Sequence, residues 1–265
     1  MRIAQVTRRV LPGMAGALCV AALFLPPHAS PAPEKSECVV LLHGLSRSRW
    51  SMKYVEWRLR REGYSVVNVS YPSRRNTVED LGRCWLPKLI AARVPAGSAI
   101  HFVTHSMGGI VVRKYLEETP AVRVGRVVMF APPNSGCEII DRLRRLRVPS
   151  KLLGPAAAQL GTDAASVPRQ LGPPGFELGI LAGNRSWNPL FSAWLPGPDD
   201  GKVSVASTRL QGMKAHRVMS CSHAWLMWRK GPVDEVLRFL KEGSFSPEPN
   251  GRSGTRQPRP DSMAP

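Results

Sequence analysis

Between residues 38 and 130 the sequence alternates short apolar runs with stretches of helical periodicity. The apolar runs occupy residues 38–45, 65–70, 99–104 and 126–130. A continuous apolar run is typical of a strand that is buried on both faces, and strands that alternate with helices form parallel sheets. The alternation therefore predicts an α/β domain with a mostly parallel central sheet and helices on both faces.

The alternation stops after Asn134, and the rest of the chain has a less regular pattern. Residues 135–178 are basic, contain several glycines and prolines, and show no clear strand, so we interpret them as a cap or lid insertion over one end of the sheet. Further strands are expected at 179–182, 202–206 and 217–219, a closing helix at 233–240, and a tail at 243–265. The tail is rich in Ser, Pro, Gly and Arg, a composition typical of disorder. We therefore predict one domain, residues 38–242.

Ser106 stands at the end of an apolar run and directly before a helical segment that contains Gly108 and Gly109. A tight strand-to-helix turn pushes a serine hydroxyl beyond the carboxyl edge of the sheet, and small neighbours let the next helix approach. The run departs from the pattern G-x-S-x-G because Thr104 replaces the first glycine. The context predicts that Ser106 is a nucleophile, and the alternative is an incidental serine at a turn.

A serine hydroxyl needs a base to take its proton, and the base needs an acid to fix its tautomer. His223 lies in a loop between the last predicted strand and the last helix, and Asp200 follows a Pro-Gly-Pro turn. The order Ser, Asp, His along the chain is one of those known for such triads. We predict that Asp200 and His223 serve Ser106, with Asp199 as the alternative acid. Four other histidines are placed less suitably: His28, His101, His105 and His216.

The segment His43-Gly44-Leu45 follows the first strong strand pattern. Acyl hydrolases place a loop there whose backbone N–H stabilises the oxyanion of the reaction, and one such donor contributes about 3–4 kcal/mol. We assign the two donors to the N–H groups of Leu45 and Met107. His43 is expected to orient the loop rather than to transfer protons, and the alternative is a tight turn without a catalytic role.

Together these segments resemble bacterial α/β-hydrolase esterases and triacylglycerol lipases, over about residues 38–242. The resemblance implies an α/β-hydrolase fold and ester hydrolysis through an acyl-enzyme. It also implies a triad of Ser106, Asp200 and His223, with Leu45 and Met107 as oxyanion donors. It implies no cofactor and no metal, because His223 is followed by Ala-Trp where calcium-dependent bacterial lipases carry an acidic residue.

Other functions remain open at this stage. Thioester, amide or lactone cleavage uses the same acyl chemistry on the same fold, and an acyltransferase would pass the acyl group to an alcohol instead of water. A non-catalytic envelope protein that keeps the fold for binding is a further alternative, motivated by Thr104 and by the positive charge.

The first thirty residues have the layout of an export signal. Three arginines precede an uncharged run from Val10 to Leu25, which is followed by prolines and small residues. The run is shorter than a typical membrane span of about 20 residues, so cleavage is favoured and an uncleaved anchor stays open. We expect an exported protein, periplasmic or secreted. One or two disulfides or free thiols are then equally compatible with the four remaining cysteines: Cys38, Cys84, Cys137 and Cys221.

The chain is strongly basic, with a net charge of +18 that is spread along its body. Such a field attracts anionic substrates and anionic membrane surfaces. Nucleic acid is not an expected partner, because no binding motif accompanies the charge. The insertion mixes leucines with basic residues at near-helical spacing, which predicts either an amphipathic lid or an ordinary basic surface helix. These residues are Leu143, Leu146, Leu152 and Leu153 with Arg142, Arg144, Arg145, Arg147 and Lys151. The predicted ligand is a small-molecule or lipid ester.

Overall fold

The computed structural model describes residues 37–120 and 122–247. The predicted export signal at 1–30 and residues 248–265 of the predicted tail lie outside the described residues. In the described part, no helix combines the length and the apolar composition that a membrane crossing requires. The cysteines of this part are free thiols, so the thiol alternative holds there and no disulfide joins them.

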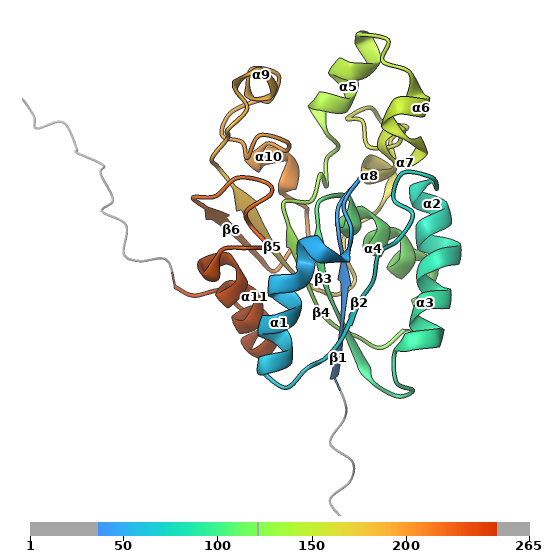
Figure 1. Cartoon of the computed structure of the whole chain (residues 1–265), viewed down its shortest axis with the longest axis vertical. Coiled ribbons are helices and arrows are strands. Elements are labelled where there is room, and N and C mark those ends of the chain that lie inside the picture. The colour runs from blue at the N-terminus through green and yellow to red at the C-terminus, as the bar shows by residue number, and fades with distance from the viewer. Residues whose placement is uncertain (1–36, 121, 248–265) are drawn as a thin grey trace, which may run out of the picture. The chain divides into compact units, whose positions relative to one another are not determined.

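Parallel strands form a six-stranded sheet in the described domain, in the order β2-β1-β3-β4-β5-β6 (Figure 1). The strands are β1 (Glu37–Leu42), β2 (Ser65–Asn68), β3 (Ala99–His105), β4 (Val124–Phe130), β5 (Glu177–Gly183) and β6 (Ala215–Met219). Every neighbouring pair in this sheet runs parallel. The prediction of an α/β fold with a parallel central sheet is therefore confirmed.

The strand order changes direction between β1 and β3. From β1 the chain adds β2 on one side and then crosses to β3 on the other. Loops that follow the two strands at such a point diverge, and they leave a crevice where ligands of open α/β sheets bind. Strand β1 leads into His43-Gly44-Leu45 and β3 leads into Ser106. The topology therefore brings two of the predicted site segments to one crevice.

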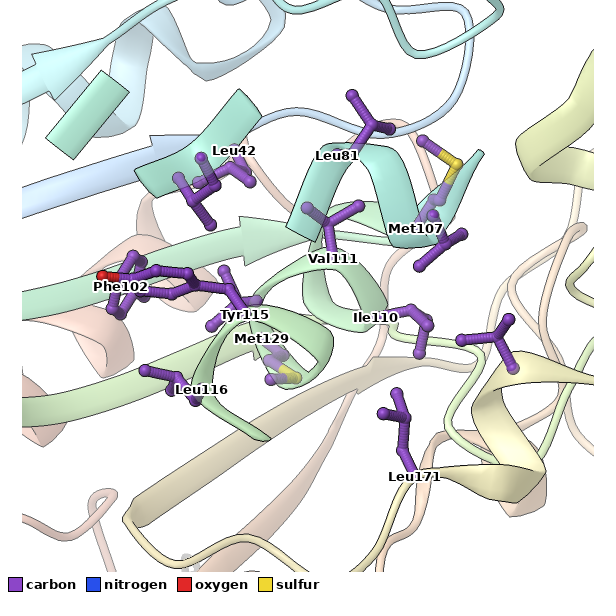
Figure 2. Packing of buried hydrophobic residues seen from close by; sticks show 14 of the residues in the cluster. Leu42, Leu81, Phe102, Met107, Ile110, Val111, Tyr115, Leu116, Met129 and Leu171 are labelled. Carbon is purple, nitrogen blue, oxygen red and sulfur yellow. The ribbon is translucent and has the colours of Figure 1, made fainter. Parts of the chain in front are cut away.

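Helices cover both faces of the sheet. One face carries α1 (Lys53–Arg61) and α11 (Lys230–Glu242), and the other carries α2 (Val78–Asp80), α3 (Leu86–Arg93) and α4 (Met107–Glu118). Successive side chains of a strand point to opposite faces. Accordingly Val40 and Leu42 enter the core beneath α4, where Figure 2 shows Leu42, while Val39 and Leu41 enter the core beneath α1 and α11. Because both faces are buried, the strands read as continuous apolar runs.

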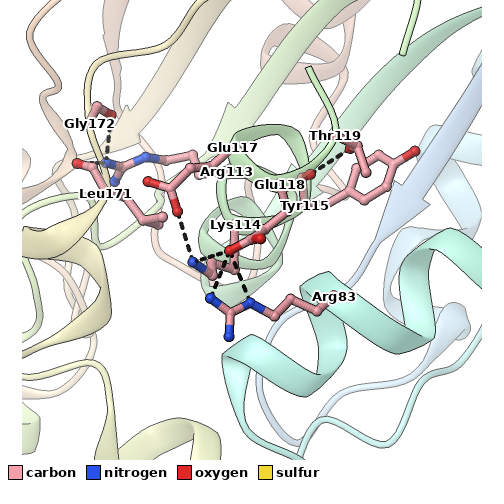
Figure 3. Close-up of polar contacts among 9 residues, drawn as sticks. All are labelled: Arg83, Arg113, Lys114, Tyr115, Glu117, Glu118, Thr119, Leu171 and Gly172. Carbon is pink, nitrogen blue, oxygen red and sulfur yellow. Dashed lines mark hydrogen bonds and ion pairs between the residues drawn. The ribbon is translucent and has the colours of Figure 1, made fainter. Parts of the chain in front are cut away.

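Helix α4 is attached to its surroundings by charged side chains (Figure 3). Arg113 is buried, and its guanidinium donates to the carbonyl oxygens of Leu171 and Gly172 and to the backbone and side-chain oxygens of Asn134. Asn134 in turn donates to the carbonyl oxygen of Thr208 at 2.9 Å. The helix that follows Ser106 is thereby tied to the segment that follows β4 and to the region between β5 and β6.

The predicted insertion contains short helices and no strand before β5. They are α5 (Glu138–Arg145), α6 (Ser150–Leu153), α7 (Pro155–Ala158) and α8 (Val167–Gln170). Between β5 and β6 the chain forms α9 (Pro189–Ser192) and α10 (Val205–Thr208). Helices α5 and α9 project from the same end of the domain in Figure 1.

The predicted strand at 202–206 is wrong. Residues 200–204 form a loop, and α10 begins at Val205. Ser204 caps this helix, because its hydroxyl accepts a hydrogen bond from the N–H of Ser207 at 3.1 Å. The alternating Val-Ser-Val pattern is typical of a half-buried strand, but the same residues are also compatible with a serine that caps a short helix.

Two other boundaries differ from the sequence-based expectation. The helical stretch expected between the apolar runs at 65–70 and 99–104 is divided into α2, a π-helical turn η2 (Leu81–Trp85) and α3. The expected tail is ordered at its start, since Phe245 packs against Phe239 with ring centroids 5.1 Å apart. The N–H of Ser246 also donates to Glu235 at 2.8 Å. The domain therefore extends to residue 247, because a single phenylalanine fixes a segment whose average composition is polar.

Candidate active site

Ser106 occupies a tight turn between β3 and α4. Its φ is 54° and its ψ is −127°, a strained combination for a residue with a side chain. The backbone is fixed there by a hydrogen bond from the N–H of Ser106 to the carbonyl oxygen of Phe130 at 2.8 Å. Strain of this kind is a feature of nucleophile turns that expose a serine hydroxyl above a sheet. The structure therefore has the local geometry that the sequence predicts around Ser106.

The glycines after Ser106 allow α4 to approach the sheet. A Cβ atom on Gly108 would lie 2.7 Å from the carbonyl oxygen of Leu42, and one on Gly109 would lie 2.8 Å from the sulfur of Met129. Both distances are shorter than a side chain tolerates. Thr104, the departure from the motif, is fully buried, and its hydroxyl would lie 3.3 Å from a Cβ of Gly109. Gly109 thus leaves the space that Thr104 fills.

The loop after β1 is held by His43 rather than by contacts to Ser106. His43 is fully buried and stacks on Tyr71 with ring centroids 4.2 Å apart. The Tyr71 hydroxyl donates to the His43 carbonyl oxygen at 2.5 Å, and the Tyr71 N–H donates to His43 Nε2 at 3.2 Å. Burial lowers the pKa of His43, so its ring stays neutral. These contacts suit a residue that orients the loop.

Asp200 and His223 are joined directly. The Nδ1 of His223 lies 2.7 Å from Oδ2 of Asp200, and the other oxygen of Asp200 accepts from the N–H groups of Lys202 at 3.0 Å and Val203 at 2.9 Å. The Asp200 side chain is fully buried. A carboxylate only accepts, so His223 carries its proton on Nδ1, and Nε2 is left as an acceptor.

The neighbouring Asp199 makes other contacts. Its Oδ1 accepts from the N–H of Gly201 at 2.7 Å and from the hydroxyl of Ser192 at 2.8 Å. Of the two adjacent acids, the structure brings Asp200 to His223 and uses Asp199 to close the turn before it.

His105 packs behind His223, which the sequence did not indicate. The two ring centroids are 4.5 Å apart, and His105 Nε2 donates to the carbonyl oxygen of His223 at 3.0 Å. Burial, followed by repulsion from the His223 ring whenever that ring is protonated, holds the pKa of His105 well below its usual value. Gly44 makes this contact possible, because a Cβ at that position would lie 2.8 Å from the His105 ring. The contacts of His105 with His223 and of Tyr71 with His43 join segments far apart in sequence, so no local motif could have predicted them.

A cavity of about 400 Å³ unites the predicted residues. Ser106, His223, Leu45 and Met107 all line it, and Asp200 lies behind His223. Met107 is the first residue of α4, so its N–H belongs to the turn whose donors have no partner within a helix. Apolar side chains of the cap and its surroundings form the remaining wall, among them Ile139, Ile140, Leu143, Leu153, Leu160 and Phe191. Arg47 and Lys202 supply its positive charge, and among residues 37–120 and 122–247 no acidic side chain lines it.

Cys137 also lines the cavity. Burial raises the pKa of this thiol to about 11, which favours the protonated form at neutral pH. Its sulfur lies 3.4 Å from the carbonyl oxygen of Lys202. In the described residues, no group of three or more His, Cys, Asp and Glu side chains is arranged to hold a metal ion.

Comparison with solved structures places the fold among those of lipases and esterases. The propeptide form of lipase BlEst2 from Bacillus licheniformis superposes with a TM-score of 0.64 at 19% identity, over 84% of this chain and 54% of that one. This chain thus spans about half of the propeptide form, whereas it covers 96% of the mature form, with a TM-score of 0.61 at 18% identity over 83% of this chain.

A metagenomic carboxyl esterase, MGS0156, superposes with a TM-score of 0.58 at 19% identity, over 84% of this chain and 82% of that one. The phospholipase PlaB from Legionella pneumophila gives 0.57 at 17% identity, over 79% and 60%. At these identities the likeness establishes the fold alone. No curated protein matches the sequence.

The family comparison covers most of the chain. Residues 39–257 match the model of the alpha/beta hydrolase family, a range that begins in β1 and includes Ser106, Asp200 and His223. The parallel sheet, the strained turn after β3 and the carboxylate–histidine pair agree with that match. The chain therefore belongs to the alpha/beta hydrolase family.

Proposed function

We propose that the protein is a serine hydrolase that cleaves carboxylic esters, with Ser106 as nucleophile, His223 as general base and Asp200 as its acid partner. The observation that carries the proposal is the 2.7 Å contact between Asp200 and His223 beside the cavity that Ser106 enters from a strained turn. Membership of the alpha/beta hydrolase family supports hydrolytic chemistry.

The reaction proceeds in two halves. His223 Nε2 takes the proton of Ser106 as its oxygen attacks the ester carbonyl, and Asp200 stabilises the imidazolium that forms. The N–H groups of Leu45 and Met107 stabilise the oxyanion of the tetrahedral intermediate. His223 then gives the proton to the departing alcohol. In the second half water attacks the acyl-enzyme as His223 takes its proton, and the proton passes to the Ser106 oxygen when the acid is released.

The cavity favours an ester with an apolar acyl group. Its wall near the proposed nucleophile is mainly aliphatic, so an acyl chain loses unfavourable contact with water when it enters. The structural neighbours include a lipase, a carboxyl esterase and a phospholipase, which supports a substrate of this kind.

The leucines of the cap divide between the cavity wall and solvent. Leu143 and Leu153 line the cavity, whereas Leu146 and Leu152 are 57% and 64% exposed. Leucines on both sides of the cap suit a segment that covers the cavity and also offers apolar side chains to a lipid surface. We therefore propose that the cap contacts a lipid or anionic surface, and activity toward a short-chain ester should rise when that ester passes from solution to emulsion.

The test of the catalytic proposal is a panel of p-nitrophenyl esters of increasing acyl length. Wild type should hydrolyse them and react with a fluorophosphonate probe, and Ser106→Ala should lose both properties, with a rate loss of about 10⁴-fold or more. Ser222→Ala is the matched control, since Ser222 is a buried serine that directly precedes His223. Retained labelling of Ser106→Ala would overturn the assignment of the nucleophile.

A further inference from the structure

The loops after β5 and β6 enclose a second, smaller cleft of about 240 Å³, separate from the cavity at Ser106. Arg185 and Trp187 come from the loop after β5, and Trp225 and Arg229 come from the segment after β6. We call these four residues the Trp–Arg cleft. It combines two indole rings with two guanidinium groups, and the proposed ester chemistry does not require these side chains.

The guanidinium groups of this cleft lack acidic partners. Arg185 donates through Nε to the hydroxyl of Ser220 at 3.0 Å, and Arg229 lies over the Trp225 ring at 5.5 Å from its centroid. Among the described residues, neither forms an ion pair with a carboxylate, and the nearby Asp234 pairs instead with Arg58 and Lys230. Two positive charges therefore stand at one cleft without compensation, which favours an anionic ligand.

The aromatic side chains of the cleft are unusually exposed. Trp187 is 84% exposed and Trp225 is 51% exposed, and Leu190 and Trp228 beside them in sequence are also largely exposed. Exposure of large apolar side chains together marks a contact surface rather than an ordinary solvated one. Tryptophan and arginine together suit the headgroup region of a bilayer, because the indole ring enters the boundary while the cation meets phosphate groups.

The cleft lies at the catalytic edge of the sheet. Both of its segments follow the carboxyl ends of strands, and Ser222, which lines the cleft, directly precedes His223. The exposed Leu190 belongs to α9, which projects from the same end of the domain as the cap helix α5 (Figure 1). A bilayer in contact with the cleft would therefore face the end of the domain that carries the cavity.

We infer that the Trp–Arg cleft docks the protein on anionic phospholipid bilayers, with Arg185 and Arg229 binding headgroup phosphates and Trp187 and Trp225 entering the interface. The inference concerns binding and goes beyond the proposed hydrolysis. Ser106→Ala should bind vesicles as wild type does, so loss of catalysis and loss of docking can be told apart.

The experiment is sedimentation of the protein with vesicles of phosphatidylcholine alone and of phosphatidylcholine with 30% phosphatidylglycerol. Wild type should bind the anionic vesicles, and Trp187→Ser with Arg229→Gln should weaken that binding about tenfold or more, since each arginine at an anionic surface contributes about fivefold. The rate on a water-soluble short-chain ester should not change in this variant. The matched control is Trp57→Ser with Arg61→Gln, because Trp57 is 48% exposed and also lies beneath a guanidinium, but on α1 and outside the cleft.

Each outcome decides the inference. Weakened binding in the cleft variant, with binding by the control variant within about twofold of wild type, supports it. Equal losses in both variants would assign the binding to general surface charge, and equal binding of wild type to neutral and anionic vesicles would remove the role of the arginines. Failure of wild type to bind anionic vesicles at low salt, where surface electrostatics are strongest, would also overturn it.

Discussion

The turn that carries Ser106 and the loop that carries Asp200 are held by different forces. At the turn, close packing fixes the backbone, since a Cβ on Gly108 would meet the carbonyl oxygen of Leu42 at 2.7 Å. In the acid loop, hydrogen bonds fix the side chain, because Asp200 accepts two backbone N–H groups besides its contact with His223. The turn therefore depends on the missing side chain of Gly108, and the acid loop depends on the carboxylate oxygens of Asp200.

This difference explains which substitutions each region should tolerate. A steric site tolerates no added atoms but is indifferent to charge, whereas a hydrogen-bonded site keeps its shape when an isosteric residue retains the acceptor. Exchanging aspartate for asparagine at the acid loop therefore tests chemistry with little change of structure. Exchanging glycine for alanine at the turn tests structure with little change of chemistry.

The largest effect is expected for Asp200→Asn. The asparagine keeps one oxygen for the N–H groups of the loop, but its amide donates to His223 Nδ1 and so leaves the proton on Nε2, where it blocks proton transfer from Ser106. We expect kcat for ester hydrolysis to fall about 10⁴-fold, measured at neutral pH with a p-nitrophenyl ester.

Asp199→Asn is the matched control for that change. The adjacent carboxylate contacts Gly201 and Ser192 and not His223, so kcat should change less than about tenfold. Equal losses in the two variants would contradict the assignment of Asp200 as the acid. A loss confined to Asp199→Asn would exchange the two roles.

A smaller effect is expected for Gly108→Ala, which tests whether close packing fixes the turn at Ser106. The added methyl group must displace α4 or the loop after β1, so the free energy of unfolding should fall by about 1–3 kcal/mol. Displacement of the turn should also lower kcat about 100-fold, because catalytic geometry tolerates little movement. Urea denaturation and ester hydrolysis measure the two quantities.

Gly175→Ala serves as the control, because no atom lies within 4 Å of a Cβ built there and its backbone is not in the left-handed region. It should change the free energy of unfolding by less than about 0.5 kcal/mol. A Gly108→Ala protein with full stability and full activity would show that the close approach of α4 is not required.

The sequence predicted the sheet well because burial on both faces leaves a strong local signal. Apolar runs such as that of β1 indicate strands that are buried on both faces, and the structure confirmed the sheet and the fold family. The predicted strand at 202–206 failed because Val-Ser-Val is compatible with both a strand and a capped turn. The decision there depends on Asp200, whose carboxylate binds the N–H groups that a strand would have used for pairing.

The contact between Asp200 and His223 in the candidate site was predictable, because chemistry demands particular residue types there. A serine at a strand-to-helix turn and a later Asp and His follow from the needs of proton transfer, and the structure brings Asp200 and His223 together. Their support was not predictable, because Tyr71 and His105 act through contacts with distant segments. The Trp–Arg cleft was missed for the same reason, since its two halves are separated by the whole segment between β5 and β6.

The last expected effect concerns one histidine at each of the two regions: His105, which is buried, and His216, which is half-buried. His105 lies at the turn, and His216 lies beside the acid region, where its Nε2 is 2.9 Å from the hydroxyl of Thr208. Burial lowers the pKa of both, that of His216 to about 4. The unfolded chain binds protons below about pH 6.5, which the folded protein does not, so stability is full above pH 6.5 and decreases as the pH falls toward 4.

His216→Gln should remove the part of the acid-induced loss of stability that is due to protonation of His216. The glutamine can still contact Thr208 but does not titrate, so the loss of unfolding free energy between pH 6.5 and 4 should be smaller than in wild type by about 1–3 kcal/mol. Urea denaturation at a series of pH values measures it, and above pH 7 the two proteins should show parallel curves. Parallel curves below pH 6.5 as well would mean that His216 has the same pKa in the folded and the unfolded chain, and the acid dependence would then belong to other groups, among them His105 and His43.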